Sequence, residues 1–387
     1  MSLKILYIIP SYAVNRGGPT SLVKELSQAL VRGGIQVDIL TTSKAGEELC
    51  AVPDGARLIQ VPRSGLAKLW TGFSWGVIKF LKNNLGHYDL IHIHELWHFP
   101  HLMAYLLHRN VPYVVTIHGG LDDWCLSHKN WKKKIYSYLI QKKIISRADM
   151  IHVLSQTEKG AVIKYLGYLA ENIKIIPNGI DVTAFENLLE EGSEPKRQSQ
   201  FSNKKYIIFL GRIHQVKGLD LLVRVFQRLS PEYPDLFLVI AGSDNDGYGG
   251  IIKKIIENYH LENKIIFSGI LTGEEKVSAL SDAQAFVLPS YSECFPMAMV
   301  EAMACRTPVI ISNQVGIYKD VAAHQAGIVV ETNPESLYKG LKKVLDNENL
   351  RQSLTDNATK MVQEHFNIKE VAQLMIRAYQ EITNKNI

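Results

Sequence analysis

Residues 290–308, SYSECFPMAMVEAMACRTP, carry the clearest pattern in the chain, and the apolar run Ala285–Leu288 precedes them. Pro296 suits the first position of a helix, where a missing N–H costs nothing. The good helix formers after it continue to a stop at Pro308. The segment therefore predicts a strand, a short loop and a helix. Unsatisfied donors and the helix dipole at such a helix start favour an anion, and the N–H groups concerned are those of Phe295, Met297 and Ala298.

Two carboxylates, Glu293 in the loop and Glu301 in the helix, frame this helix start. The Glu301 side chain leans toward the N-terminus of its helix and is therefore expected to reach the same pocket. A carboxylate only accepts hydrogen bonds, which suits a pair of sugar hydroxyls. Taken alone, the two residues favour a plainer alternative of one loop glutamate and one solvated helix glutamate. Their interpretation depends on the rest of the chain.

The composition is that of an ordinary cytoplasmic protein of two domains. The chain has 387 residues, 46% of them apolar and 21% charged. Its first residues, MSLKILYIIPSY, run straight into a strand pattern, so we expect no signal peptide, and no apolar stretch is long enough to span a membrane. A net charge of +5 does not indicate nucleic-acid binding. The cysteines form no CxxC pair and are expected to be reduced thiols: Cys50, Cys125, Cys294 and Cys305.

Near-continuous apolar strands alternate with helices in the first half, a pattern typical of a parallel sheet covered on both faces. The predicted strands are residues 4–9, 35–41, 90–94, 112–117, 150–154 and 173–176. The predicted helices are residues 19–32, 101–109, 129–145 and 157–166. These elements form one Rossmann-like domain.

The polar run 186–203 is typical of a linker, and a second alternating series follows it. Its predicted strands are residues 206–210, 236–241, 265–267, 285–288, 309–311 and 327–330. Helices are expected at 218–229, 250–259, 274–281, 334–346, 349–364 and 368–384, besides the one after Pro296. We therefore expect one Rossmann-like domain at 1–190, a second at 191–365, and a C-terminal helix at 366–387 that crosses back to the first. Two facing α/β domains predict a ligand cleft between them, at the carboxyl ends of the strands.

Arg212 and Lys217 follow the strand 206–210 directly, in GRIHQVKG. An arginine fork and a lysine point charge on one loop are suited to a diphosphate. A solvated basic loop is the alternative, but the two glutamates elsewhere in this domain favour the phosphate site.

Two further strand ends carry candidate binding residues. Gly17 and Gly18 open a helix after the first strand and permit close approach of a phosphate or sugar. His118, followed by two glycines, ends another strand and is placed to donate to a substrate hydroxyl or to transfer a proton, although a structural histidine fits equally well.

Two weaker patterns lie in the first domain. The histidines near residue 92 match no zinc spacing, so the wall of a pocket is the better interpretation for them: His92, His94, His98 and His101, with Glu95. Lysines around Lys132 concentrate positive charge on one predicted helix. That helix fits either an anionic membrane surface or an ordinary solvated face.

With these pieces placed, nearly the whole chain resembles glycosyltransferase family 4, whose members are retaining transferases of the GT-B fold. The similarity rests on motifs that together are highly specific: GGP at Gly17, HxH at His92, TIHG at His118, IPNGID at 176–181, GRIHQVKG at Gly211, AGSDNDG at Ala241, FSGIL at Phe267 and SYSECFPMAMVEA at Ser290. The chain has Pro296 and Arg306 where the family often has glycine, which bears on donor specificity.

The resemblance implies a role for each matching residue. Arg212 and Lys217 bind the diphosphate, with Gly17 and Gly18 nearby, and Glu301 holds the ribose hydroxyls. His118 lies near the transferred sugar. The donor sugar is held by Glu293 together with the loop and helix start, Cys294, Phe295, Pro296 and Met297. The base is lined by Gly269, Ile270 and Leu271.

The resemblance also implies the reaction. His118, Glu293, Arg212 and Lys217 are the expected catalytic residues. No metal or other cofactor is expected, because fixed cations can stabilise the leaving diphosphate. The domain at 1–190 is expected to bind the acceptor, and the domain at 191–365 the nucleotide sugar. UDP-glucose is the favoured donor, ahead of UDP-N-acetylglucosamine and UDP-galactose. The expected acceptor is a saccharide or lipid-linked saccharide in exopolysaccharide synthesis, at the cytoplasmic face of the membrane.

Three other functions fit parts of this pattern. A sugar-nucleotide epimerase shares this architecture. A glycosidase would use Glu293 and Glu301 as its two carboxylates, which lie about 5–9.5 Å apart in that class, and it would leave the Arg212 and Lys217 pair without a purpose. A non-catalytic nucleotide-sugar sensor would bind the donor without turnover.

Overall fold

The computed structural model describes residues 2–14, 18–68, 70–127, 136–190, 201 and 203–384, and the chain forms two compact units. Unit 1 comprises Met1–Gly179 and Ile368–Ile387, and unit 2 comprises Ile180–Asn367. The division falls at Gly179 rather than at residue 190, because α8 (Val182–Glu190) packs with helices of unit 2. The second division follows Asn367, and α16 (Ile368–Asn384) packs against α1 (Gly18–Arg32) of unit 1.

Unit 1 is built on a parallel sheet whose described strands lie in the order β3-β2-β1-β4-β5-β6-β7. The central strands are buried on both faces, which explains their near-continuous apolar sequences. The strands are β1 (Lys4–Ile8), β2 (Gln36–Ser43), β3 (Arg57–Pro62), β4 (Leu90–His94), β5 (Tyr113–Thr116), β6 (Met150–Val153) and β7 (Ile173–Ile175).

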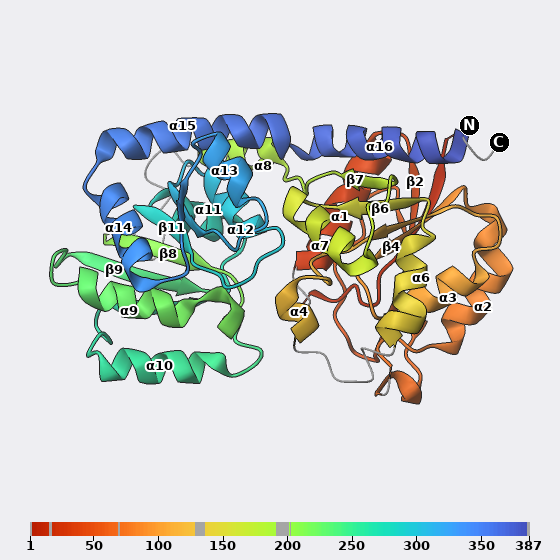
Figure 1. The fold of residues 1–387 in the computed structure, drawn as a ribbon, viewed down its shortest axis with the longest axis horizontal. Coiled ribbons are helices and arrows are strands. Elements are labelled where there is room, and N and C mark those ends of the chain that lie inside the picture. Colours follow the sequence, from red (N-terminus) through yellow and green to blue (C-terminus); the bar gives the residue numbers. More distant parts are fainter. Residues whose placement is uncertain are drawn as a thin grey trace. The chain divides into compact units, whose positions relative to one another are not determined.

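Two layers of helices cover this sheet (Figure 1). On one face α1 and α16 pack against Tyr7 and its neighbours, with Val23 and Met375 in the contact. On the other face lie α2 (Trp75–Asn84), α3 (Phe99–Leu107), α6 (Lys142–Ser146) and α7 (Gln156–Leu166). A short helix, α4 (Asp123–Ser127), follows β5.

Unit 2 repeats the same plan with described strands in the order β10-β9-β8-β11-β12-β13, all parallel. These strands are β8 (Lys205–Leu210), β9 (Leu236–Ala241), β10 (Ile265–Gly269), β11 (Ala285–Leu288), β12 (Val309–Ser312) and β13 (Ile328–Val330). The strand order reverses between the neighbouring strands β8 and β11, and α/β sheets bind ligands at the carboxyl ends of the strands at such a switch point.

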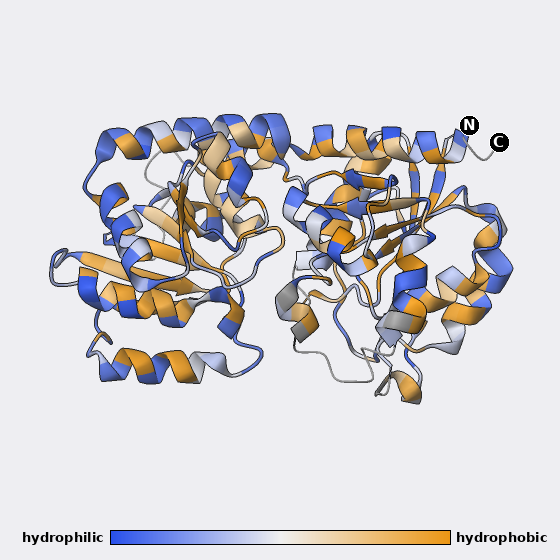
Figure 2. Ribbon diagram, in the orientation of Figure 1, coloured by the Kyte–Doolittle hydropathy of each residue, from blue (hydrophilic) through white to orange (hydrophobic). Residues whose placement is uncertain are grey.

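The helices of unit 2 also form two layers. One contains α9 (Leu219–Leu229), α10 (Tyr248–Asn258) and α14 (Pro334–Leu345), and the other contains α8, α11 (Gly273–Ser281), α12 (Met297–Ala304) and α15 (Glu348–His365). Another helix, α13 (Tyr318–Ala323), packs against β13. Helices such as α9 alternate apolar and polar residues while the strands are mostly apolar (Figure 2), as expected for amphipathic layers on buried sheets.

Four features of the fold differ from the sequence-based prediction. The pattern did not predict β3, an edge strand with only partly buried or exposed residues, nor α2, α4 and α13. The helix α8 occupies the start of the predicted linker. In the predicted helix 129–145, residues 128–135 lie outside the described part, Ser137–Gln141 is π-helical and α6 follows. Pro296 is the residue that caps α12 rather than its first helical residue.

Candidate functional site: charged side chains at the edge of the second sheet

The loop that follows β8 is held tightly against the end of β11. Backbone hydrogen bonds join Gly211 to the carbonyl of Ala241 (2.9 Å) and Tyr291 to that of Val216 (2.7 Å). Gly218 is required here: its φ is +70°, and an added Cβ would lie 2.2 Å from the carbonyl oxygen of Pro289. This contact brings the loop with Arg212 and Lys217 beside the loop with Glu293.

The position of Glu293 is fixed by its backbone on both sides. Its N–H donates to the carbonyl of Gln314 (3.2 Å), and its own carbonyl accepts from Gly316 (2.7 Å). The neighbouring Ser290 carbonyl accepts from the hydroxyl of Ser312 (2.6 Å). The loop therefore presents the Glu293 side chain from a rigid frame.

Two ion pairs occupy this edge of the sheet. The Lys217 ammonium contacts the Glu293 carboxylate, and both side chains are about 15% exposed (14% and 15%). The ammonium of Lys276, on α11, lies 2.8 Å from the Glu301 carboxylate. The two predicted carboxylates are thus each neutralised by a lysine.

Arg212 differs from these lysines, because it is exposed and makes no ion pair with any residue that the structure describes. Its guanidinium is therefore free to bind an anion. Lys276 is a charged neighbour of the site that the sequence analysis did not identify, since it belongs to no motif and lies 25 residues from Glu301.

The start of α12 offers unpaired backbone donors, as predicted. Pro296 caps the helix with φ −86° and ψ 87° and supplies no side-chain cap. The N–H groups of Phe295, Met297 and Ala298 have no acceptor among the described residues. Phe295 itself is buried against Phe366. Such donors and the helix dipole make a site for negative charge.

The segment predicted to line a base ends β10. Gly269 adopts a left-handed φ of +77°, and its carbonyl accepts from Gly242 (2.7 Å). Leu271 is buried, whereas Ile270 is 67% exposed. An exposed apolar side chain between two fixed neighbours is compatible with a surface on which a flat base rests.

In unit 1, Gly18 and His118 follow strands β1 and β5 at the carboxyl edge of the sheet. Gly18 begins α1, and Gly17 lies outside the described residues. His118 follows β5 with a left-handed φ of +50°. The next residue, Gly119, donates its N–H to Glu158 (2.6 Å), whose other oxygen accepts from Leu154 (2.7 Å). The buried carboxylate of Glu158, which the sequence analysis missed, thus holds the loops after β5 and β6.

Two buried histidines of the same sheet, His92 and His152, belong to one series of hydrogen bonds. Nδ1 of His92 lies 2.6 Å from the Tyr379 hydroxyl and its Nε2 lies 2.6 Å from Thr116 Oγ1. Thr116 Oγ1 lies 2.7 Å from Nδ1 of His152, whose Nε2 lies 2.8 Å from the carbonyl of Ile176. The Tyr7 and Tyr379 hydroxyls are 2.8 Å apart.

The position of each proton in this series of hydrogen bonds follows from the Ile176 carbonyl at its end. Burial lowers the pKa of His152 to about 4 and the pKa of His92 well below its usual value, so both rings are neutral near pH 7. The Ile176 carbonyl can only accept, so Nε2 of His152 donates to it and Nδ1 accepts from Thr116. Nε2 of His92 then donates to Thr116, and Tyr379 donates to Nδ1 of His92. Each of these hydrogen bonds thus has one donor and one acceptor, and together they join α16 to four strands, β1, β4, β5 and β6.

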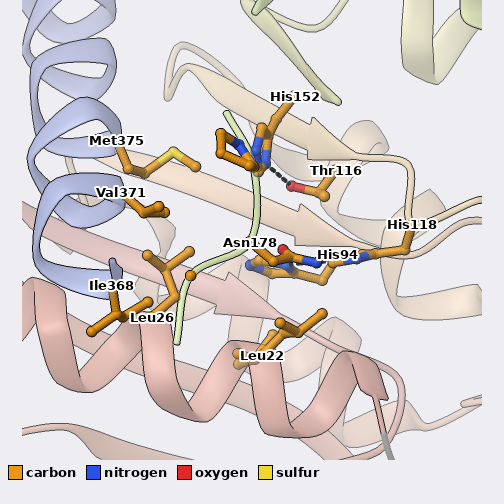
Figure 3. A pocket seen from close by; sticks show the side chains of 13 residues that line it. Leu22, Leu26, His94, Thr116, His118, His152, Asn178, Ile368, Val371 and Met375 are labelled. Atoms are coloured by element: carbon orange, nitrogen blue, oxygen red, sulfur yellow. Dashed lines mark hydrogen bonds between the residues drawn. The ribbon is translucent and has the colours of Figure 1, made fainter. Parts of the chain in front are cut away.

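The same hydrogen bonds bear on the zinc hypothesis for these histidines. Both nitrogens of His92 are engaged with Tyr379 and Thr116. Within the described residues, no three histidine, cysteine, aspartate or glutamate side chains group in a way that could hold a metal ion. His94, His118 and His152 line a small cavity (Figure 3).

Two statements concern the membrane. Among the described helices, none combines the length and apolar composition that crossing a bilayer requires. The basic segment around Lys132, predicted to contact a membrane surface, lies outside the described residues.

Comparison with known proteins gives the same family over both units. The family model Glycosyltransferase Family 4 matches residues 16–184, and Glycosyl transferases group 1 matches residues 191–361. An uncharacterized glycosyltransferase of Methanocaldococcus jannaschii is 28% identical, with 94% of each chain covered. The D-inositol 3-phosphate glycosyltransferase of Corynebacterium jeikeium is 26% identical, with 95% of this chain and 92% of that protein covered.

Solved structures share the fold. Sucrose-phosphate synthase from Thermosynechococcus elongatus superposes with a TM-score of 0.81 at 22% identity, covering 99% of this chain and 100% of that one. Anabaena HepE, solved with UDP-glucose, gives 0.77 at 17% identity, covering 98% of this chain and 100% of that one. The matches to both halves and the two parallel-sheet units show that the chain belongs to the family 4 type of glycosyltransferases, with the GT-B fold.

Proposed function

We propose that the chain transfers a hexose from a nucleoside diphosphate sugar, with UDP-glucose as the donor, to a saccharide or lipid-linked saccharide in polysaccharide synthesis. The observation that carries this proposal is the set of charged side chains at the switch point of unit 2: Arg212, Lys217, Glu293 and Glu301. Anabaena HepE, which shares the fold, was solved with UDP and with UDP-glucose.

The diphosphate is assigned to Arg212, Lys217 and the start of α12. Arg212 is exposed and without a carboxylate partner among the described residues, so its fork can bind phosphate oxygens. Lys217 forms an ion pair with Glu293. A diphosphate therefore competes with Glu293 for this ammonium, and its arrival releases the carboxylate toward the hydroxyls of the donor sugar.

The nucleoside is assigned to the neighbouring residues of the same unit. Glu301 accepts hydrogen bonds from the two ribose hydroxyls, while Lys276 keeps the carboxylate in place through their 2.8 Å contact. The segment from Gly269 to Leu271 lines the base, with Ile270 as its exposed apolar surface. In unit 1, Gly18 and His118 keep the roles that the family resemblance implies.

The proposed reaction retains the anomeric configuration and uses no metal. The bond between the sugar C1 and the leaving phosphate oxygen breaks, and its electron pair goes to the diphosphate. The acceptor oxygen bonds to C1 on the same face, and its proton passes to a phosphate oxygen. Arg212, Lys217 and the α12 donors supply positive charge to the diphosphate, so they stabilise the negative charge that grows on it.

Two assays test this chemistry. Transfer from UDP-glucose is expected to proceed at the same rate in EDTA, and NMR of the product is expected to show the donor's anomeric configuration. Loss of activity on chelation, restored by one divalent ion, would contradict the metal-free mechanism. An inverted product would contradict retention.

The acceptor has a second candidate. Several relatives are named D-inositol 3-phosphate glycosyltransferases, which favours a phosphorylated polyol as the alternative. A panel that pairs UDP-glucose with lipid-linked saccharides, free oligosaccharides and inositol phosphates separates the two candidates. Product formed from the donor alone would instead indicate an epimerase, and hydrolysis of aryl glycosides without nucleotide would indicate a glycosidase.

A further inference from the structure

Two buried nitrogens of unit 1 that have no hydrogen-bond partner belong to residues that line the same cavity. They are Nε2 of His94 and the side-chain nitrogen of Asn178, and neither bonds to any residue that the structure describes. The two residues are 2% and 9% exposed. The cavity has a volume of about 20 Å³, room for one water molecule. Its walls are otherwise largely apolar, with Leu22 and Met375 among them (Figure 3).

The other nitrogen of His94 contacts His118. Nδ1 of His94 lies 3.2 Å from Nε2 of His118. Burial lowers the pKa of His94 well below its usual value and that of His118 to about 4, so each ring carries one proton near pH 7. Only two arrangements are then possible. Either His94 donates from Nδ1 to His118, or His118 donates from Nε2 to His94.

The cavity distinguishes these arrangements. The side-chain nitrogen of Asn178 can only donate, so a water in the cavity accepts from it. If His94 carries its proton on Nδ1, its bare Nε2 accepts a proton of that water. Among the unpaired, fully buried side-chain atoms of the described lining residues, only Nε2 of His94 can accept a proton of the water. If His94 carries its proton on Nε2, this acceptor is lost and two donors face the water. Unpaired buried donors are costly, so the first arrangement is favoured.

We propose that Asn178, a bound water and His94 together hold His118 in the tautomer with its proton on Nδ1. His118 then accepts at Nε2 from His94 and presents an N–H at Nδ1, which has no partner among the described residues. A substrate oxygen, from a hydroxyl or a phosphate, is the group that this donor binds. His94 and Asn178 are positioning residues that act through His118, and their effect on turnover rests on the proposed function.

The tautomers are measured directly by NMR on the full chain with 15N-labelled histidine. Two-bond proton–nitrogen correlations show which ring nitrogen carries the proton. His94 and His118 are expected to carry it on Nδ1, whereas His92 and His152 are expected to carry it on Nε2 and serve as internal references. A proton on Nε2 of His118 would overturn the proposal whether or not the protein is active.

A matched pair of variants tests the consequence for turnover. In His94→Asn the amide nitrogen takes the place of Nδ1 and still donates to His118, whereas in His94→Gln the amide lies near the place of Nε2 and that donor is lost. We expect His94→Asn to keep most of kcat. We expect His94→Gln to lose about tenfold in kcat, the value of one hydrogen bond, with KM for the donor little changed.

The outcomes of this pair are separable from failure of the proposed function. Equal losses in the two variants, at equal melting temperatures, would show that His94 is only structural and would overturn its positioning role. If the unaltered protein transfers no sugar from any donor, the proposed function fails while the NMR result still decides the tautomers.

Discussion

The contact between Lys217 and Glu293 predicts that removing a carboxylate strengthens nucleotide binding. The two side chains are 14% and 15% exposed and form an ion pair. Two unit charges about 4 Å apart attract by about 4 kcal/mol at an effective dielectric constant of 20. Solvent screening brings the value for exposed pairs to about 1 kcal/mol or less. This partly exposed pair lies between these limits, and the diphosphate must displace it.

Glu293→Gln removes the competing charge and keeps the shape. UDP no longer has to displace the carboxylate from Lys217, which we take to be worth about 1–2 kcal/mol of the ion-pair energy. UDP should therefore bind roughly 5- to 30-fold more tightly to this variant. Turnover of UDP-glucose should fall, because the carboxylate that holds the sugar is lost. Lys217→Ala should weaken UDP binding by about tenfold or more, the value of a hydrogen bond to a charged group. Isothermal titration and initial rates measure the two effects.

A matched control removes the same charge elsewhere in unit 2. Glu335 pairs with Arg228 at 3.2 Å on the surface, with side chains 57% and 43% exposed. Glu335→Gln should leave both UDP affinity and turnover unchanged. If Glu293→Gln weakens UDP binding as much as Lys217→Ala does, Glu293 orients the lysine for the diphosphate, and the competition inferred here is refuted.

Three further predictions concern stability. Burial lowers the pKa of the His152 ring to about 4, whereas its pKa in the unfolded chain is about 6.5. Between these pH values the unfolded chain therefore binds one more proton than the folded protein. Chemical denaturation should therefore show stability intact above pH 6.5 and falling toward pH 4, by up to about 3 kcal/mol from this ring; a flat profile would contradict neutral burial. Tyr379→Phe removes the donor to His92 and should cost about 1–3 kcal/mol in unfolding free energy, and an unchanged value would refute the derived proton order. Gly218→Ala forces a Cβ to within 2.2 Å of the Pro289 carbonyl and should lower the melting temperature and UDP affinity together, whereas a variant that matches the parent in both would contradict the required contact.

Much of the fold and of the second unit's site could be predicted because the signals are local. Arg212, Lys217 and Glu293 each follow an apolar strand within a few residues, and parallel strands bring their carboxyl ends to one edge. The helix after Pro296 is indicated by its own helix-forming residues and by Pro308, which ends it. Such features need no knowledge of distant parts of the chain.

The partners of these residues could not be predicted, because they come from tertiary contacts. Lys276 reaches Glu301 from another helix, and Tyr379 meets His92 from 287 residues away. No motif marks Glu158, whose role appears only when two loops meet it. The edge strand β3 lacks the continuous apolar run of a buried strand, since its outer side is not covered.

The central claim is that unit 2 binds the diphosphate of a UDP-sugar without metal. Calorimetric titration of the full chain with UDP, GDP and ADP in EDTA tests it most directly, with Lys217→Ala as the comparison. The account predicts micromolar binding of UDP, little binding of GDP or ADP, and loss of UDP binding in the variant. Absence of binding by any nucleotide, or binding that appears only after a divalent ion is added, would contradict it.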